Sequence, residues 1–314
     1  MAQPTNTFDT YDAVGQREDL TDVIYNISPS DSPFISMIGR TTAKNTLHEW
    51  QTDSLASVDG ANAQIDGDDA SGTAITATTR VNNRCQISRK VVVISGSAEA
   101  TDKAGRKSEM AYNMAKKAKE LKRDMETIVC GSQVEVAGNA TTARKTRGLE
   151  SWLLTNKGHG SGGATNSSTG VVTDGTQRSA TEALLKAQLQ TIYTAGGEPT
   201  VIMVGPSNKQ TFSGFSGIAT QYRDNRKVGP AKIIASADIY VSDFGEMSIV
   251  PNRFSRDRTA TIIQPDMWAM SYLRPFRKEK LAKNGDSDRV MILAEYSLEA
   301  RNEASSGKLA DLSV

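Results

Sequence analysis

The chain has 314 residues, of which 38% are hydrophobic, and its 37 basic and 36 acidic side chains nearly cancel. This balance excludes strong nucleic-acid affinity through a globally basic surface, and the apolar share is too high for a disordered chain. No apolar run reaches the length of a membrane span, and the polar start is not a signal peptide, so we expect a protein of cytosolic origin with no membrane partner.

Residues 1–45 read as an extended arm with scattered apolar side chains. One short helix is predicted within it, with Ser32 as N-cap, Pro33 at the first helical position and Gly39 as the stop. Its apolar side chains are Phe34, Ile35 and Ile38. Whether the arm packs on its own domain or on another copy stays open at this point.

Residues 46–95 are predicted to form a long two-stranded ribbon. Polar side chains alternate with period two along a return strand that begins near Ile75, and only residues 90–94 look like a buried strand. The tip, residues 59–72, is acidic and rich in turn-forming residues. An isolated ribbon is barely stable in water, so it should lie on a neighbouring copy or, alternatively, on its own subunit.

A long helix is predicted over residues 107–128, within the segment bounded by Gly105 and Gly131. Its apolar positions recur at steps of three or four: Met110, Met114, Ala118, Leu121, Met125 and Ile128. This stripe is narrow, and we expect other copies of the chain to cover it. The basic side chains on the rest of the helix are Lys116, Lys117, Lys119, Lys122 and Arg123. They could contact phosphates, or form a solvated face with the pairs Lys116–Glu120 and Lys122–Glu126.

Residues 156–178 are rich in Gly, Ser and Thr and are predicted to be a mobile surface loop. Compact α/β structure should follow. Ser179 and Glu182 have the spacing of a capping box at the start of a helix that Gly196 and Gly197 end. A buried strand is expected at 201–204 and a second helix from Ser207. Further strands are expected at 239–241, 247–250, 259–263, 267–273 and 290–301.

Motifs for catalysis and for cofactor binding are missing. The glycines at 158, 160 and 163 match a dinucleotide fingerprint in letters only, because no helix pattern follows them. The two histidines, His48 and His159, lie far apart in the sequence and make a Ser–His or Cys–His pair poorly supported. We therefore predict no catalytic residue and no cofactor.

Metal and disulfide chemistry is also not indicated. The acidic cluster Asp66, Asp68 and Asp69 matches no calcium loop and reads as a solvated turn or a salt-bridge partner. Cys85 and Cys130 lack a CxxC spacing and are predicted to be free thiols.

Taken together, the order of these parts resembles the major capsid (major head) protein of tailed bacteriophages, which has the Hong Kong ninety-seven type of shell fold. Short motifs spread over nearly the whole chain carry this resemblance: SPF at 32–34, EWQTD at 49–53, GDD at 67–69, ELKRDME at 120–126, DFG at 243–245, LRPF at 273–276 and EYSLE at 295–299.

The resemblance implies an α+β fold with named parts. These are an N-terminal arm (1–45), an E-loop ribbon (46–95), a P-domain with a spine helix (96–145), an A-domain (146–258), and return strands of the P-domain with the C-terminus (259–314). It also implies a structural protein without enzymatic activity. Copies would assemble in the host cytoplasm into pentamers and hexamers of an icosahedral virion capsid around double-stranded DNA.

The implied partners are other copies of the chain, a separate scaffolding protein, a portal, a decoration protein, and packaged DNA held by weak non-specific contacts. Some family members join E-loops through a lysine–asparagine isopeptide bond. Residues 49–84 contain no lysine, so we do not expect that bond at the ribbon tip. The sequence starts directly at the arm, and this favours a scaffolding protein that is a separate chain.

Without a covalent link, the ribbon tip should be held by charge and apolar contacts. The hypothesised subunit-interface residues are Phe34, Trp50, Asp66, Asp68, Asp69, Arg80, Arg84, Arg274, Arg277 and Lys278. Three other interpretations remain at this stage. They are an encapsulin-like compartment shell, a soluble α/β enzyme acting through Asp238, Asp243 or the 156–178 loop, and a DNA-binding protein using the helix at 107–128.

Overall fold

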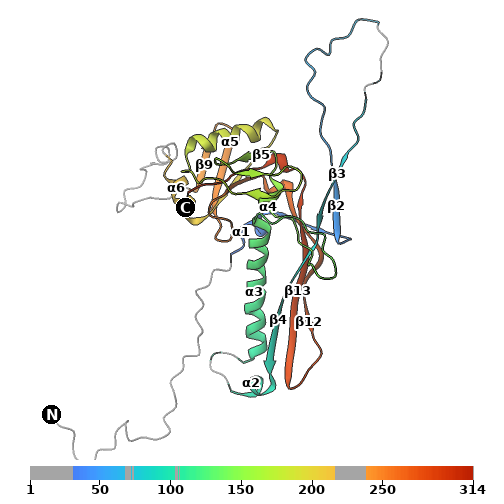
Figure 1. Cartoon of the computed structure of the whole chain (residues 1–314), viewed down its shortest axis with the longest axis vertical. Helices are drawn as coiled ribbons and strands as arrows, with labels where there is room; N and C mark the ends of the chain where they lie inside the picture. Colours follow the sequence, from blue (N-terminus) through green and yellow to red (C-terminus); the bar gives the residue numbers. More distant parts are fainter. Residues whose placement is uncertain are drawn as a thin grey trace, which may run out of the picture.

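The computed structural model describes residues 31–67, 72, 74–102, 105, 107–215 and 238–313. Two lobes and a projecting ribbon make up this part of the chain (Figure 1). The elongated lobe contains a four-stranded sheet with one long helix beside it. The compact lobe contains a six-stranded sheet with shorter helices.

The sheet of the elongated lobe has the order β1-β12-β13-β4. Its strands are β1 (Gly39–Thr42), β12 (Trp268–Lys280), β13 (Ser287–Ala300) and β4 (Gln86–Ser95). β1 runs parallel to β12, and the other neighbours are antiparallel. The two central strands therefore come from residues 268–300 and the two edges from residues 39–95.

β12 continues well past the predicted end at residue 273. The register between β12 and β13 shifts on both sides of Arg274, and Pro275, which has no N–H to donate, lies in that irregular stretch. Pro275 and the charged residues after it are not typical of a strand, so the sequence does not indicate that β12 continues. Strand pairing with β13 maintains the strand nonetheless.

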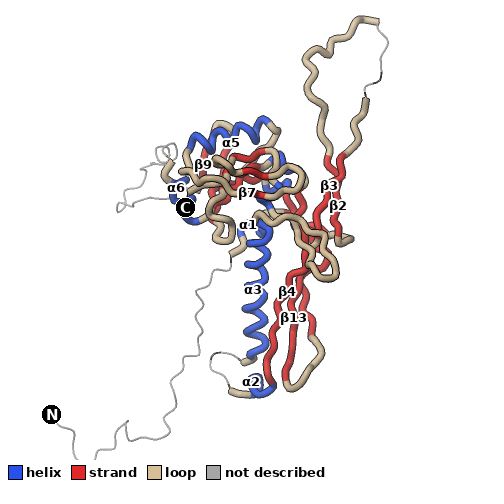
Figure 2. Tube along the Cα trace, in the orientation of Figure 1, coloured by secondary structure: helices blue, strands red, loops and turns tan. Residues whose placement is uncertain are grey.

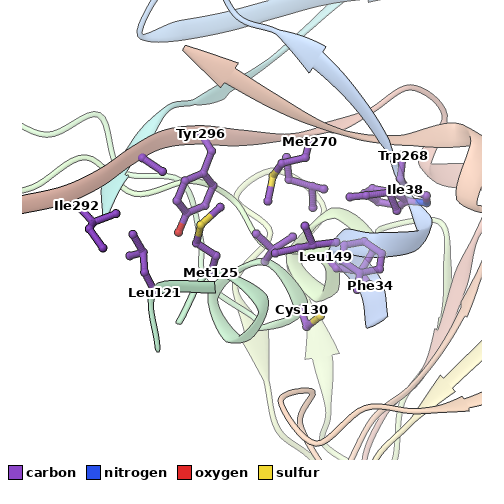
Figure 3. Packing of buried hydrophobic residues seen from close by; sticks show 14 of the residues in the cluster. Phe34, Ile38, Leu121, Met125, Cys130, Leu149, Trp268, Met270, Ile292 and Tyr296 are labelled. Atoms are coloured by element: carbon purple, nitrogen blue, oxygen red, sulfur yellow. The ribbon is translucent and has the colours of Figure 1, made fainter. Parts of the chain in front are cut away.

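Helix α3 (Glu109–Cys130) confirms the predicted long helix, with Ser108 as its N-cap. Its apolar stripe is covered by the chain itself rather than by other copies, which corrects the expectation from sequence. Leu121 and Met125 pack beside Ile292 and Tyr296 of β13, as Figure 3 shows. The stripe was visible in the sequence, but part of its cover, β13, lies about 170 positions further along the chain, and β4 supplies another part.

Three short helices join these parts: α1 (Pro33–Met37), α2 (Gly96–Ala100) and α4 (Leu149–Trp152). The predicted helix after Ser32 is therefore confirmed as α1. Ser32 occupies the N-cap position, but its side chain makes no capping hydrogen bond. Phe34 is 0% exposed and lies in the core of the elongated lobe.

The sheet of the compact lobe has the order β5-β14-β11-β8-β10-β9. Its strands are β5 (Asn156–Gly158), β14 (Gly307–Leu309), β11 (Ala260–Ile263), β8 (Val201–Val204), β10 (Gly245–Pro251) and β9 (Ile239–Ser242). The predicted helices are present as α5 (Glu182–Thr194) and α6 (Pro206–Ser213). Thr181, not Ser179, caps α5 through its side chain, whereas Gly196 ends the helix with φ +86° as expected. Two 3₁₀ turns, η1 (Pro265–Met267) and η2 (Glu303–Ser305), complete this region.

The segment 156–178, predicted to be a mobile loop, contains β5 and the small hairpin of β6 (Ala164–Thr165) and β7 (Val172–Thr173). Asp311 ties it to the end of the chain by accepting hydrogen bonds from the amides of Gly160 (3.0 Å) and Gly175 (2.8 Å). A side chain at Gly160 would meet the Thr176 carbonyl oxygen at 2.2 Å. Close packing therefore accounts for the glycines, against backbone at Gly160 and against the side chains of Gln188 and Asp311 at Gly158 and Gly163.

The ribbon consists of β2 (Leu47–Thr52) and β3 (Thr79–Arg84), paired antiparallel from Leu47↔Arg84 to Thr52↔Thr79. The return strand begins at Thr79 rather than near Ile75. Beyond this pairing the chain forms a wide loop that extends away from both lobes (Figure 2). All described residues of that loop, which spans residues 53–78, are exposed.

Replacing Leu121 by Ala should destabilise the unassembled subunit by about 2–5 kcal/mol, because the side chain is only 1% exposed between α3 and β13. Chemical denaturation followed by circular dichroism measures this change. Lys119→Ala on the exposed side of the same helix is the control and should have little effect. Equal stability losses in the two variants would contradict the assigned core.

Candidate assembly surfaces

Glu126 of α3 joins three distant segments of the chain. Its carboxylate accepts hydrogen bonds from the amides of Phe34 (2.8 Å) and Ile35 (3.0 Å) at the start of α1. It also accepts one from the side-chain amide of Asn252 (2.8 Å), which follows β10 in the compact lobe. Glu126 is 0% exposed. The predicted surface pair Lys122–Glu126 is therefore wrong.

The chemistry of this joint follows from the free N–H groups at a helix start. The first amides of a helix have no partner inside the helix, and a carboxylate there satisfies them and interacts favourably with the helix dipole. Burial raises the pKa of the Glu126 carboxyl, and the hydrogen bonds from Ile35, Phe34 and Asn252 oppose that shift. Glu126 thus caps α1 in place of the Ser32 side chain.

The root of the ribbon is fixed to its own subunit. The indole N–H of Trp50 donates to the carbonyl oxygen of Ala300 at 2.8 Å, and the ring lies 5.7 Å from that of Trp152. The guanidinium of Arg147 stands over Trp152 at 4.4 Å. Trp50 therefore anchors the ribbon within the chain, and the free part of the ribbon starts beyond Thr52.

His48 lies beside a serine and a carboxylate, a grouping that the sequence did not suggest. Its Nε2 is 3.0 Å from both Ser271 Oγ and Glu299 Oε2, and Thr41 also donates to Glu299. In a catalytic triad the nucleophile and the acid contact opposite ring nitrogens. Here both contact the same nitrogen, so the cluster has the geometry of a structural tie between β2 and the sheet.

The second histidine belongs to a polar cluster of the compact lobe. His159 Nε2 is 2.9 Å from the Thr165 hydroxyl, and its Nδ1 is 3.5 Å from Asp311. The buried ammonium of Lys308 donates to Thr165 and to the carbonyl oxygen of Glu150, and burial lowers the pKa of Lys308 to about 8. These contacts hold β5, β6 and β14 together.

Neither a metal site nor a membrane segment emerges from the described part of the chain. It contains no group of three or more His, Cys, Asp or Glu side chains arranged to hold a metal ion. None of its helices is both long and apolar enough to span a membrane. Cys85 and Cys130 are free, in agreement with the predicted thiols, and both are buried. Burial raises the pKa of the Cys85 thiol to about 11 and that of Cys130 well above its usual value, so both are protonated at neutral pH.

The loop of the ribbon exposes apolar side chains to an unusual degree. We define the ribbon loop as residues 53–78, and its large apolar members are Leu55 (98% exposed), Val58 (98%), Ile65 (79%) and Ile75 (97%). Asp59 and Asp66 are exposed beside them. The interface candidates Asp68 and Asp69 lie outside the described residues. This loop is the part of the ribbon that could contact a neighbouring copy.

A second exposed apolar strip lies on β4. Val92 and Ile94 point toward α3, whereas Ile87 (46% exposed), Val91 (40%) and Val93 (54%) point away from it. Arg89 is exposed between them, and Arg289 of β13 pairs with Val93. We call Ile87, Arg89, Val91, Val93 and Arg289 the outer sheet face. At its end is a hollow of ≈ 430 Å³, lined by Ile87, Ala137, Gly138, Asn139, Thr142, Ala143 and Arg144.

Most of the basic interface candidates already have partners within the chain. Their ion pairs are Arg80–Glu49 (3.9 Å), Arg84–Glu135 (3.1 Å), Arg274–Glu295 (2.6 Å) and Arg277–Glu279 (2.8 Å). Lys278 is exposed and forms no ion pair with any residue that the structure describes. Phe34 is fully buried in its own core, so its side chain offers no surface to a neighbour.

The basic side chains of α3 divide into two groups. Lys117 pairs with Glu120 at 2.7 Å, in place of the predicted pair of Lys116 with Glu120, and Arg123 lies over the ring of Phe254 at 5.4 Å. The others, Lys116, Lys119 and Lys122, are exposed and have no ion-pair partner within residues 31–67, 74–102, 107–215 and 238–313. Their spacing of three residues places them on one side of the helix. We call these three side chains the lysine row.

Comparison with known proteins places this arrangement among viral shell proteins. Residues 3–313 match the family model described as the SU10 major capsid protein. The chain is also 30% identical to the major capsid protein of Escherichia phage Phieco32, over 98% of this chain and 97% of that protein.

Solved capsid structures share the fold at low sequence identity. A cyanophage A-1(L) capsid chain aligns with a TM-score of 0.65 and 12% identity, covering 97% of this chain and 98% of its own. A chain of Mycobacterium phage Che8 aligns with a TM-score of 0.57 and 16% identity, covering 94% and 97%. The similarity extends over both lobes and is not confined to one of them.

Changing Glu126 to Gln should destabilise the subunit by about 1–3 kcal/mol, because only one side-chain oxygen remains to accept and a buried donor is left unpaired. Thermal or chemical unfolding of the unassembled protein measures the loss. The control is Glu120→Gln, which removes a carboxylate from the outer side of the same helix. If both variants unfolded at the same temperature or denaturant concentration as the wild type, the hydrogen bonds of Glu126 would not contribute to stability.

Proposed function

The chain belongs to the SU10 major capsid protein family, and on that premise we propose how its copies hold one another in the shell. It is a phage major capsid protein with an α+β fold of the Hong Kong ninety-seven type, and its place is the virion capsid. The observation that carries this assignment is the 30% identity to a phage major capsid protein over 98% of the chain. Neither an encapsulin-like compartment shell nor a soluble enzyme gains support.

The proposed correspondence with the parts of that fold follows the two lobes. The elongated lobe corresponds to the P-domain with α3 as spine helix, the compact lobe to the A-domain, and the ribbon to the E-loop. β12 and β13 return to the P-domain and supply the two central strands of its sheet. Our proposed role is structural, not catalytic, and the single ring nitrogen shared by Ser271 and Glu299 at His48 supports it.

Contact between copies is proposed to run from the ribbon loop of one subunit to the outer sheet face of its neighbour. Leu55, Val58 and Ile75 are almost fully exposed in the single chain, and complete burial of such side chains contributes about 1.5–3 kcal/mol each. The strip formed by Val91 and Val93 offers an apolar surface for them. Apolar contact, rather than charge pairing, therefore contributes most of the free energy of this interface.

Charge then sets the direction of docking. The ribbon loop carries Asp59 and Asp66, and the outer sheet face carries Arg89 and Arg289. Exposed pairs contribute only about 0.2–1 kcal/mol each, and salt screens them. The acidic tip therefore orients the loop, and the apolar side chains provide most of the affinity.

The wider set of partners is also proposed. Copies form pentamers and hexamers of an icosahedral head around double-stranded DNA, with a separate scaffolding protein, a portal and a decoration protein. Packaged DNA would meet the lysine row, whose side chains have no ion-pair partner among the described residues of their own subunit. Such contacts are weak and non-specific, because they involve phosphates rather than bases.

The proposed contact between the ribbon loop and the outer sheet face can be tested with a double-mutant cycle. One variant changes Leu55 and Val58 to Ser, a second changes Val91 and Val93 to Thr, and a third combines all four changes. If the two surfaces touch, each pair weakens shells at low and high salt, and the combined variant loses less than the sum. Thermal disassembly followed by light scattering measures the losses. Strictly additive losses would mean that the loop and the face have other partners.

The proposed role of charge in orienting the ribbon loop is tested by changing Asp66, Asp68 and Asp69 together to Asn. Shells of this variant should be weakened most at low ionic strength, where charge is least screened, while folding of the subunit is unchanged. The same disassembly assay over a salt series measures the effect. Shells that match the wild type at every salt concentration would show that charge does not orient the loop.

Because the lysine row is proposed to face DNA, we expect the subunit to bind double-stranded DNA with an affinity that falls as salt increases. Changing Lys116, Lys119 and Lys122 to Gln should reduce the slope of log affinity against log salt by about 0.9 for each phosphate that a lysine no longer neutralises. Binding of the unassembled subunit to a DNA duplex over a salt series measures the slope. Lys186→Gln on α5, where Glu182 already pairs with the lysine, is the matched control. An unchanged slope in the triple variant would contradict a DNA-facing lysine row.

A further inference from the structure

The turn between β12 and β13 contains the only Asn–Gly dipeptide of the sequence, Asn284–Gly285. Both residues are exposed at the far tip of the elongated lobe, where Figure 1 shows the hairpin ending beside α2. Gly285 has φ +87°, and apart from its two chain neighbours no atom of the described residues lies within 4 Å of the position that a Cβ would take. The turn is therefore open on the side of Gly285 where a side chain would stand.

This geometry suits a self-modification that needs only water. The backbone nitrogen of Gly285 attacks the side-chain carbonyl carbon of Asn284, a new C–N bond closes a five-membered succinimide, and the amide nitrogen leaves as ammonia. Water then opens either side of the ring, giving aspartate or isoaspartate. One water is consumed, one ammonia is released, and no oxidant or reductant is required.

Charged neighbours favour the step and respond to it. Two cations stand near the turn, because the ammonium groups of Lys280 and Lys283 lie 3.7 and 3.1 Å from Asp288; the carboxylates of Asp286 and Asp288 lie beside them in the sequence. Positive charge stabilises the deprotonated amide nitrogen that attacks. The product places a new carboxylate next to Lys283, where it competes with Asp288 for the same cation.

The tip of the β12–β13 hairpin also contacts the start of α2, so a chemical change at Asn284 affects more than the turn itself. The amide of Gly96, at the start of α2, donates to the carbonyl oxygen of Asp286 at 3.3 Å. A side chain at Gly96 would meet Asp286 Oδ1 at 2.5 Å, which shows how closely the two segments pack. Isoaspartate adds one methylene to the main chain two residues before Asp286 and shifts that residue away from Gly96.

We propose that Asn284 is a spontaneous deamidation and isoaspartate site of this capsid subunit, and that its conversion loosens the contact between the hairpin tip and α2. Because each shell holds many copies, the reaction would give an ageing particle a growing number of altered tips. Asn139 offers an internal comparison. Its side chain accepts hydrogen bonds from the amides of Thr141 (2.9 Å) and Thr142 (2.7 Å), and Ala140 follows it.

The test uses the full-length protein, both unassembled and in shells, incubated in warm, mildly alkaline buffer made with water enriched in heavy oxygen. Peptide mass spectrometry should find heavy oxygen incorporated at 284 but not at 139. An isoaspartyl methyltransferase with labelled methyl donor should mark the wild type and not the Asn284→Ser variant. Amides of residues 96–101 should exchange hydrogen faster in the aged wild type than in the aged variant.

Two results would overturn the proposal. One is conversion at 284 no faster than at 139, which would show that the exposed glycine turn does not promote the reaction. The other is equal exchange of residues 96–101 in aged wild type and aged variant, which would show that conversion does not reach α2. The Asn284→Ser variant keeps Gly285 and its positive φ, so a folding defect would not produce either result.

Discussion

The carboxylate of Glu126 holds together segments that lie far apart in the sequence. It receives the first two amides of α1, about 90 residues earlier, and the side-chain amide of Asn252, 126 residues later. Because the group is fully buried, each of its oxygens must keep its partners, since losing one leaves a polar group without a hydrogen bond. The position of α1 against α3, and of α3 against the compact lobe, follows from this requirement.

With α1, α3 and the compact lobe joined at Glu126, the subunit buries its central core and leaves the ribbon loop exposed. Phe34 and Ile38 enter the core from α1, and the stripe of α3 is covered by β4 and β13. Trp50 and His48 fix the ribbon root to the same core. The loop beyond Thr52 and the outer sheet face are among the apolar surfaces that remain exposed.

The sequence predicted the elements whose signals are local. Helical periodicity identified α3, a short apolar run identified β8, and the alternation of polar residues identified the ribbon. Features that depend on distant residues were missed. Glu126 reads as one more charged residue on a wet helix, although it stands between Met125 and Val129 on the buried side. The segment 156–178 reads as a loop because Asp311, which ties it down, is more than 130 residues away. The sequence also does not show that two of the predicted interface residues, Arg274 and Arg84, form ion pairs within their own chain.

Hydrogen exchange of the unassembled wild-type subunit, followed by mass spectrometry, tests the role of Glu126 most directly. If its carboxylate joins α1, α3 and the compact lobe, the amides of Phe34 and Ile35 should be protected as strongly as the buried turns of α3 around Met125. They should also lose protection together with those turns as denaturant is added. Rapid exchange at Phe34 and Ile35 while the centre of α3 stays protected would contradict this role.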